Sequence, residues 1–412
     1  MAFTSRAQRL WAYWHAERRT LRQGLVALTL STLAGFVAGL SLSHITGTLE
    51  ALPGMLVLIP AAVGMKGTIF GAIGGRLGTA SAAGLFEPNL EPGGVLYRNV
   101  YVAIVTTFSS SLWLAVLARL ASAALGQTAI SIWKLAVISI LGGALGSVFV
   151  LVITVGLSVL SHRRGWDLDS VSTPMVTALG DMTTLPSLFL ATFLVRIEAV
   201  AVVAAVVSVA VALYATVRSY SVADAAIRRI VFEMTATILL TPILDVLAGG
   251  LQQGRHTELF AVPVVLTLIP PFVSQAGAIG GIFASRITSK LQVGVITARG
   301  WPEVPALVDA SLVGSLAIVV FTLIGAVAYG LAAATGLHGL PAFGTLLAGT
   351  LIAGLLATPL TIVVGYYLAV VTYRFGLDPD NQSVPIITSV MDLVGVGVVL
   401  AVMTSLGVLP HG

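Results

Sequence analysis

Long apolar segments follow one another along almost the whole chain, separated by short polar loops. They are rich in Ala, Val, Leu and Ile and lack the alternating pattern of barrel strands, so they predict membrane-spanning helices. Each is about 20 residues or longer, as a hydrocarbon core of ~30 Å requires. We expect eleven spans, at 24–44, 52–83, 99–125, 130–160, 171–195, 199–217, 230–250, 260–289, 304–334, 342–372 and 384–408.

The composition supports an all-α polytopic membrane protein. Hydrophobic residues make up 57% of the chain and charged residues 9%, whereas about a quarter of a soluble domain is charged. Cysteine is absent, which excludes disulfides and thiolate metal sites. The net charge of +4 does not indicate nucleic-acid binding, because the basic residues lie mostly in loops. The N-terminus lacks the pattern of a removable signal peptide.

The basic residues also predict the orientation in the cell membrane. With a cytoplasmic N-terminus, the inner loops contain Arg98, Arg163, Arg164, Arg218, Arg228, Arg229, Lys290, Arg299 and Arg374. The outer positions keep only Arg119, Lys134, Arg196 and Arg255. This distribution fits the positive-inside rule and puts the C-terminus outside. Residues 1–23 combine arginines with Trp and Tyr, which predicts a cytoplasmic amphipathic helix on the lipid surface or a basic tail that only fixes orientation.

The chain contains an internal repeat. Leu58–Arg76 reads LIPAAVGMKGTIFGAIGGR, and Leu268–Arg286, 210 positions later, reads LIPPFVSQAGAIGGIFASR. Each repeat therefore has five spans, and we place the boundaries of the two repeats at 24–198 and 230–412. Residues 199–229 form a connector helix and a cytoplasmic loop.

The connector determines the orientation of the second repeat in the membrane relative to the first. Because five spans is an odd number, one extra crossing restores the orientation of the second repeat. The two repeats should then be parallel and related by a pseudo-twofold axis along the membrane normal, so a single chain mimics a homodimer as a monomeric pseudo-dimer. The alternative, that 173–217 is one segment, fails because about 45 residues at ~1.5 Å each are too long for one crossing.

Each repeat carries an acid inside an apolar helix. Ser172–Thr184 reads STPMVTALGDMTT, and its second version, SVPIITSVMD, ends at Asp392. Asp181 thus corresponds to Asp392, and Thr177 to Thr388, with each threonine on the acid's helix face. An intramembrane acid marks an ion or substrate path by default. We expect both acids near the membrane midplane at one shared site; the alternative is a pair of structural acids that are protonated or bonded to backbone.

Two carboxylates with hydroxyl and carbonyl oxygens form a site for hard cations such as Mg²⁺, Ca²⁺ or Mn²⁺. Mg²⁺ dehydrates reluctantly and is usually held by one or two carboxylates with several of its waters retained. The six histidines lie in loops or near span ends, which argues against Zn²⁺ or Cu²⁺. Asp167 and Asp378 precede the midplane acids by fourteen residues. At the cytoplasmic mouth they would attract cations, or serve only as solvated loop acids or helix caps.

Two further charged residues break the symmetry of the repeats. Asp245 is a third intramembrane acid whose counterpart is Gly35. It either belongs to a site for a coupling ion or is buried with a hydroxyl partner. Lys66, whose counterpart is Ala276, would oppose a nearby cation unless it pairs with an acid or reaches the interface.

At these residues the chain resembles the MgtE-like divalent cation transporters, in particular the solute carrier family 41 type with two fused membrane repeats. The first matching motif is P-x-x-x-G-x-K-G with a following arginine segment, at Pro60–Thr79, and its copy at Pro270–Ser289 departs at Ser274 and Ala276. The second is G-x-D-x-D followed by P-x-x-T-x-x-x-D, in both repeats. The resemblance implies that Asp181 and Asp392 are pore acids and that Asp167 and Asp378 lie at the inner mouth.

We therefore expect a transporter or channel for Mg²⁺, with other hard divalent cations as further candidate substrates, and no enzymatic activity. The first alternative is a secondary transporter or exchanger that couples cation movement to Na⁺ or H⁺. A remote alternative is an intramembrane enzyme or lipid-binding scaffold. That alternative would need a nucleophile–base pair or a metal–histidine cluster at membrane depth, and the sequence shows neither.

Overall fold

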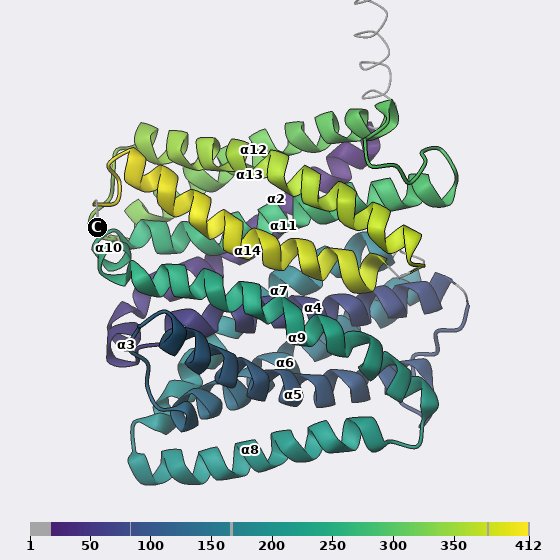
Figure 1. Ribbon diagram of the computed structural model, residues 1–412, viewed down its shortest axis with the longest axis horizontal. Helices are drawn as coiled ribbons and strands as arrows, with labels where there is room; N and C mark the ends of the chain where they lie inside the picture. The colour runs from purple at the N-terminus through teal and green to yellow at the C-terminus, as the bar shows by residue number, and fades with distance from the viewer. Residues whose placement is uncertain (1–17, 83, 165–167, 377–378, 411–412) are drawn as a thin grey trace, which may run out of the picture.

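The computed structural model describes residues 18–82, 84–164, 168–376 and 379–410, and its regular elements in these ranges are helices that form one bundle (Figure 1). In chain order they are α2 (Arg18–His44), α3 (Thr46–Ala51), α4 (Met55–Ala82), α5 (Val95–Ala124), α6 (Ile132–Arg164), α7 (Leu168–Thr192), η1 (Phe193–Val195), α8 (Glu198–Ser221), α9 (Ala225–Gly254), α10 (His256–Ala261), α11 (Pro263–Gln292), α12 (Val304–Thr335), α13 (Phe343–Arg374) and α14 (Pro379–Ser405). The expected all-α class is confirmed.

Ten helices in the described ranges are long and apolar enough to cross a membrane. The remaining expected span, 171–195, corresponds to α7, whose apolar part Leu179–Val195 is shorter. Between α7 and α8 the chain forms the short helix η1. The segment 173–217 is therefore divided between the two long helices α7 and α8 and is not one continuous helix. The expected surface helix in residues 1–23 lies mostly outside the described residues, and α2 already begins at Arg18.

The two halves repeat the same order of helices and interlock with each other. The elements α2 to α7 recur as α9 to α14, including the short helices α3 and α10. The first long helix of each half packs on the second long helix of the other half: α2 contacts α11, and α9 contacts α4. Glycines make both crossings possible: a Cβ atom would collide with the Thr267 carbonyl at Gly39 and would lie 2.5 Å from the Val57 carbonyl oxygen at Gly249. Thr267 and Val57 are themselves repeat counterparts, so the same contact forms twice.

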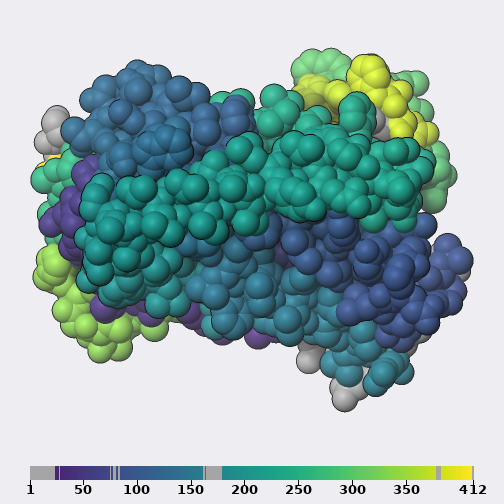
Figure 2. All heavy atoms as spheres, turned by 90° about the horizontal axis from the view of Figure 1, so that it is seen from below, coloured from purple at the N-terminus to yellow at the C-terminus, as the bar shows by residue number. Residues whose placement is uncertain are grey.

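The connector α8 lies on the outside of the bundle (Figure 1). It packs on α5 and α6, which belong to the first half. Viewed from its side, α8 lies across the near face of the molecule with nothing in front of it (Figure 2). Apolar side chains on its outer face are largely exposed, including Val203 at 64% and Val217 at 67%. Such a face suits contact with lipid tails.

A polar clamp joins the second and third spans in each half. In the first half Arg76 donates from Nε to Oδ1 of Asn99 at 2.9 Å. In the second half the equivalent Arg286 donates to Asp309 at 3.0 Å, and Lys290 adds an ion pair of 2.5 Å to the same carboxylate. Asp309 is fully buried. The clamp ties the end of α11 to the start of α12 and positions α11 for the site described next.

Candidate cation site

The two repeat acids lie inside the bundle on α7 and α14. Asp181 is 4% exposed, and its Oδ2 atom has no hydrogen-bond partner among the described residues. Asp392 lies within electrostatic range of Asp181, and as a whole residue it is partly buried. Neither acid faces the lipid side.

Asp245 on α9 joins Asp392 at this place. Its side chain is fully buried and lies beside the Asp392 carboxyl group and the Ser389 hydroxyl. Neither carboxyl oxygen has a hydrogen-bond partner of acceptable geometry. Gly64 on α4 leaves room for this pair: a Cβ atom there would lie 2.7 Å from Oδ2 of Asp245 and 3.4 Å from Oδ2 of Asp392. The sequence showed Asp245 as an unmatched acid, but not that it meets Asp392.

The Asp181 side of the site has different chemistry. Ser274 on α11, the repeat counterpart of Gly64, lies beside the Asp181 carboxyl group. Its Oγ atom has no other partner, and both amide atoms of the neighbouring, fully buried Gln275 are also without one. One repeat acid is therefore accompanied by a neutral hydroxyl, and the other by a second carboxyl group.

The remaining predicted site residues are only partly visible. Asp167 and Asp378 lie outside the described residues, and so does the side chain of Thr177. Thr388 packs on α11, since a Cβ atom at Gly277 would lie 2.8 Å from its Cγ2. The Thr388 hydroxyl donates to the Pro385 carbonyl at 2.9 Å. Its role as a cation ligand stays a prediction.

Lys66 lies in the first half on α4, next to α7. The side chain is 4% exposed, and Nζ has no hydrogen-bond partner. The ammonium group occupies the space that a side chain at Gly146 would need, close to Ser187 on α7. Lys66 therefore neither reaches the membrane surface nor pairs with an acid in the described part of the chain.

The acids do not form a closed metal cage. In the described ranges, no group of three or more His, Cys, Asp or Glu side chains is arranged to hold one metal ion. A cation held here would keep water in part of its coordination sphere. Mg²⁺ is the divalent ion that most readily does so.

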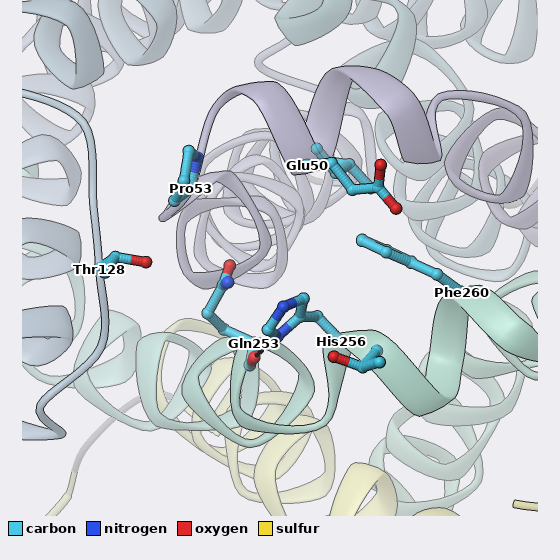
Figure 3. A pocket seen from close by; sticks show the side chains of 8 residues that line it. Glu50, Pro53, Thr128, Gln253, His256 and Phe260 are labelled. Atoms are coloured by element: carbon cyan, nitrogen blue, oxygen red, sulfur yellow. Dashed lines mark hydrogen bonds between the residues drawn. The ribbon is translucent and has the colours of Figure 1, made fainter.

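A separate cavity of about 280 Å³ lies at the end of the bundle near α3 and α10. Its lining includes Glu50 on α3 and Gln253, His256 and Phe260 from the second half (Figure 3). None of the predicted site residues lines it. The cavity is therefore distinct from the site of the buried acids.

Interlocked helices of membrane-spanning length, with carboxyl groups buried in their interior, define a polytopic membrane protein. The comparison with known families agrees: the chain belongs to the MgtE family of divalent cation transporters, which matches residues 59–191 and 269–402. The two matched regions correspond to the two halves, and each contains one of the repeat acids. Neither the search of the curated proteins nor that of the solved structures returned a match. The protein is thus a transporter of divalent cations and not an enzyme.

Proposed function

We propose that the protein transports Mg²⁺ through a path between its two halves, with Asp181 and Asp392 binding the partly hydrated ion near the middle of the membrane. The observation that carries the proposal is the convergence of carboxyl groups from both halves in the interior of the bundle, without a basic partner among the described residues. Charge of this kind at membrane depth is costly unless it serves an ion. A transported dication compensates it, and the missing chelating cage allows the ion to leave again.

The first-repeat and second-repeat acids would act together. Asp181 approaches the path from α7 and Asp392 from α14, so that each half supplies one negative charge. Asp167 and Asp378 would collect cations at the cytoplasmic mouth. Thr177 and Thr388 would add hydroxyl oxygens near the midplane acids.

The test is Mg²⁺ flux into liposomes that contain the purified protein and a Mg²⁺-sensitive dye. The double variant Asp181→Asn/Asp392→Asn keeps side-chain size and removes both charges, and we expect flux to fall to the level of empty liposomes. Glu233→Gln is a matched control, because this acid is exposed and pairs with Arg229 at the surface. Wild-type rates in the double variant would refute the site. Flux of other divalent ions without Mg²⁺ flux would refute the proposed substrate.

A second candidate is exchange of the divalent cation against Na⁺ or H⁺. Asp245 favours it, since one half has an additional buried carboxyl group that the other lacks. The same liposomes distinguish the two. Flux through a channel continues at equal Na⁺ and pH on both sides, whereas an exchanger follows an imposed Na⁺ or proton gradient.

We also propose that the end of the bundle with the arginine clamps faces the cytoplasm. Arg98, Arg286 and Arg374 lie in or beside the loops expected on that side, which supports this orientation. The test is labelling of single cysteines by an impermeant maleimide in intact cells. A cysteine at the exposed position 221 should be protected and one at the exposed position 410 labelled; the reverse pattern would overturn the orientation.

A further inference from the structure

We propose that Asp245 is a specificity-determining residue of the transporter and that the cation binds off the pseudo-twofold axis, against the Asp245–Asp392 pair. The inference rests on the proposed function, because it concerns the same cation path. It adds that the two sides of the path differ: the side with Asp245 and Asp392 binds the cation more tightly than the side with Asp181.

The contact between α9 and α4 places Asp245 at this point of the path. Gly249, one turn after Asp245, packs on Val57, just as Gly39, one turn after Gly35, packs on Thr267. Positions 245 and 35 therefore occupy the same register in the two crossings. At position 35 a Cβ atom would lie 2.9 Å from the Pro271 Cα atom, so the backbones leave no room for a side chain. Only the second half can carry a side chain here.

Gly64 completes the arrangement. Its absent side chain leaves the space in which the carboxyl groups of Asp245 and Asp392 lie next to each other. In the other half this position is Ser274, beside Asp181. The Asp392 side therefore has Gly64 with Asp245, whereas the equivalent positions on the Asp181 side are Ser274 and Gly35. A hydroxyl group supplies a neutral oxygen, whereas a carboxylate supplies a full negative charge for a dication.

The unpartnered oxygens indicate that the pair serves a ligand. Asp245 is fully buried, and neither of its oxygens has a well-aligned hydrogen-bond partner among the described residues, although the Ser389 hydroxyl lies beside it. A purely structural buried carboxyl group is normally satisfied by donors, because an unpaired one is costly. Two adjacent carboxyl groups, of which Asp245 has both oxygens without a well-aligned donor in the described residues, suit a cation that bridges them. Asp392 as a whole residue is not fully buried.

The variant Asp245→Asn tests the proposal on the full-length protein in liposomes. We expect the Mg²⁺ concentration for half-maximal flux to rise at least tenfold, with the maximal rate changed less than the half-saturating concentration. Thr241→Val is the matched control on the same helix, since the Thr241 hydroxyl bonds only to its own helix at the Thr237 carbonyl. That control should retain the wild-type concentration dependence.

A second pair of variants changes only the space around the carboxyl groups. Gly64→Ala would push a methyl group against Asp245 and should raise the half-saturating concentration in the same direction. Gly71→Ala, on the same helix, meets nothing within 4 Å and should leave transport unchanged. Thermal unfolding in detergent with increasing MgCl₂ gives a readout independent of transport, and the stabilisation should need at least tenfold more Mg²⁺ in Asp245→Asn.

The outcomes separate this inference from the proposed function. If the wild type transports Mg²⁺ and the Asp181→Asn/Asp392→Asn variant does not, while Asp245→Asn keeps the wild-type half-saturating concentration and thermal shift, Asp245 is only structural and the inference fails. If the wild type itself transports no Mg²⁺, the proposed function fails first.

Discussion

Removal of the Asp309 carboxylate tests whether the polar clamp holds the second half together. Asp309 is fully buried and accepts from Arg286 at 3.0 Å. The Lys290 ammonium lies 2.5 Å from its other oxygen. The side chains of Arg286 and Lys290 are 17% and 19% exposed. One buried anion therefore compensates two largely buried cations.

The expected cost follows from that arrangement. Asp309→Ala removes the shared anion and leaves the two cations near each other, and loss of one partner of a buried pair costs about 3–5 kcal/mol. Asp309→Asn reproduces the clamp of the first half, where Arg76 donates to Asn99 at 2.9 Å. It keeps a neutral hydrogen bond but loses the charge, so we expect a smaller loss of about 1.5–3 kcal/mol.

The assay is reversible unfolding in mixed detergent micelles, with helix content followed by circular dichroism during titration with SDS. The matched control is Asn99→Asp, which adds the acid beside Arg76 in the first half and should not lower the free energy of unfolding. The reasoning is refuted if Asp309→Ala lies within about 0.5 kcal/mol of the wild type, the range of ordinary surface substitutions, or if Asp309→Asn is the more damaging variant.

Two further predictions concern stability. Lys66→Met removes a buried nitrogen without a hydrogen-bond partner and should raise the free energy of unfolding by about 1–3 kcal/mol; a lower melting temperature in detergent would contradict this. Asp224 caps α9 by accepting from the backbone N–H of Ala226 at 2.8 Å, and the hydrogen bond from Arg98 is the main cause that lowers its pKa. The pKa of Asp224 in the folded state lies below the usual 3.8. Ionised Asp224 therefore stabilises the fold above pH 3.8, and this contribution is lost as the pH falls through the folded-state pKa. Asp224→Ala should thus lower the free energy of unfolding by about 1 kcal/mol at neutral pH. In acid the unfolding curves of the variant and the wild type should converge. A difference that is the same at every pH would show that the charge of Asp224 is not the cause.

The sequence was sufficient for the helices and their repeat because both depend on local patterns. Long apolar runs can only be spans, and the shared LIP motif at Pro60 and Pro270 aligns the halves. Asn99 and Asp309 also occupy equivalent positions, 210 residues apart. Their contacts with Arg76 and Arg286 do not follow from local patterns, because the partners lie 23 residues apart on different helices.

The interlocking of the halves could not be predicted because it depends on which backbones approach each other. Gly39 and Gly249 are two among 43 glycines, and only the crossings with α11 and α4 distinguish them from packing glycines elsewhere. The same limit applies to Asp245. The sequence left open a coupling ion or a hydroxyl partner. The structure places both the Ser389 hydroxyl and the Asp392 carboxyl group beside Asp245, in the space left by Gly64.

Fusion of the two halves into one chain explains how the asymmetry can exist. In a homodimer every substitution occurs twice, once in each subunit. An acid at position 245 would then recur at the place of Gly35, where the Pro271 backbone leaves no room for it. Likewise a lysine at position 66 would recur at Ala276, beside the second path acid's helix. A fused chain can keep one added anion and one added cation in different halves. The proposed path would then have one side richer in carboxylate and one side with a nearby ammonium group, a polarity that two identical subunits cannot have.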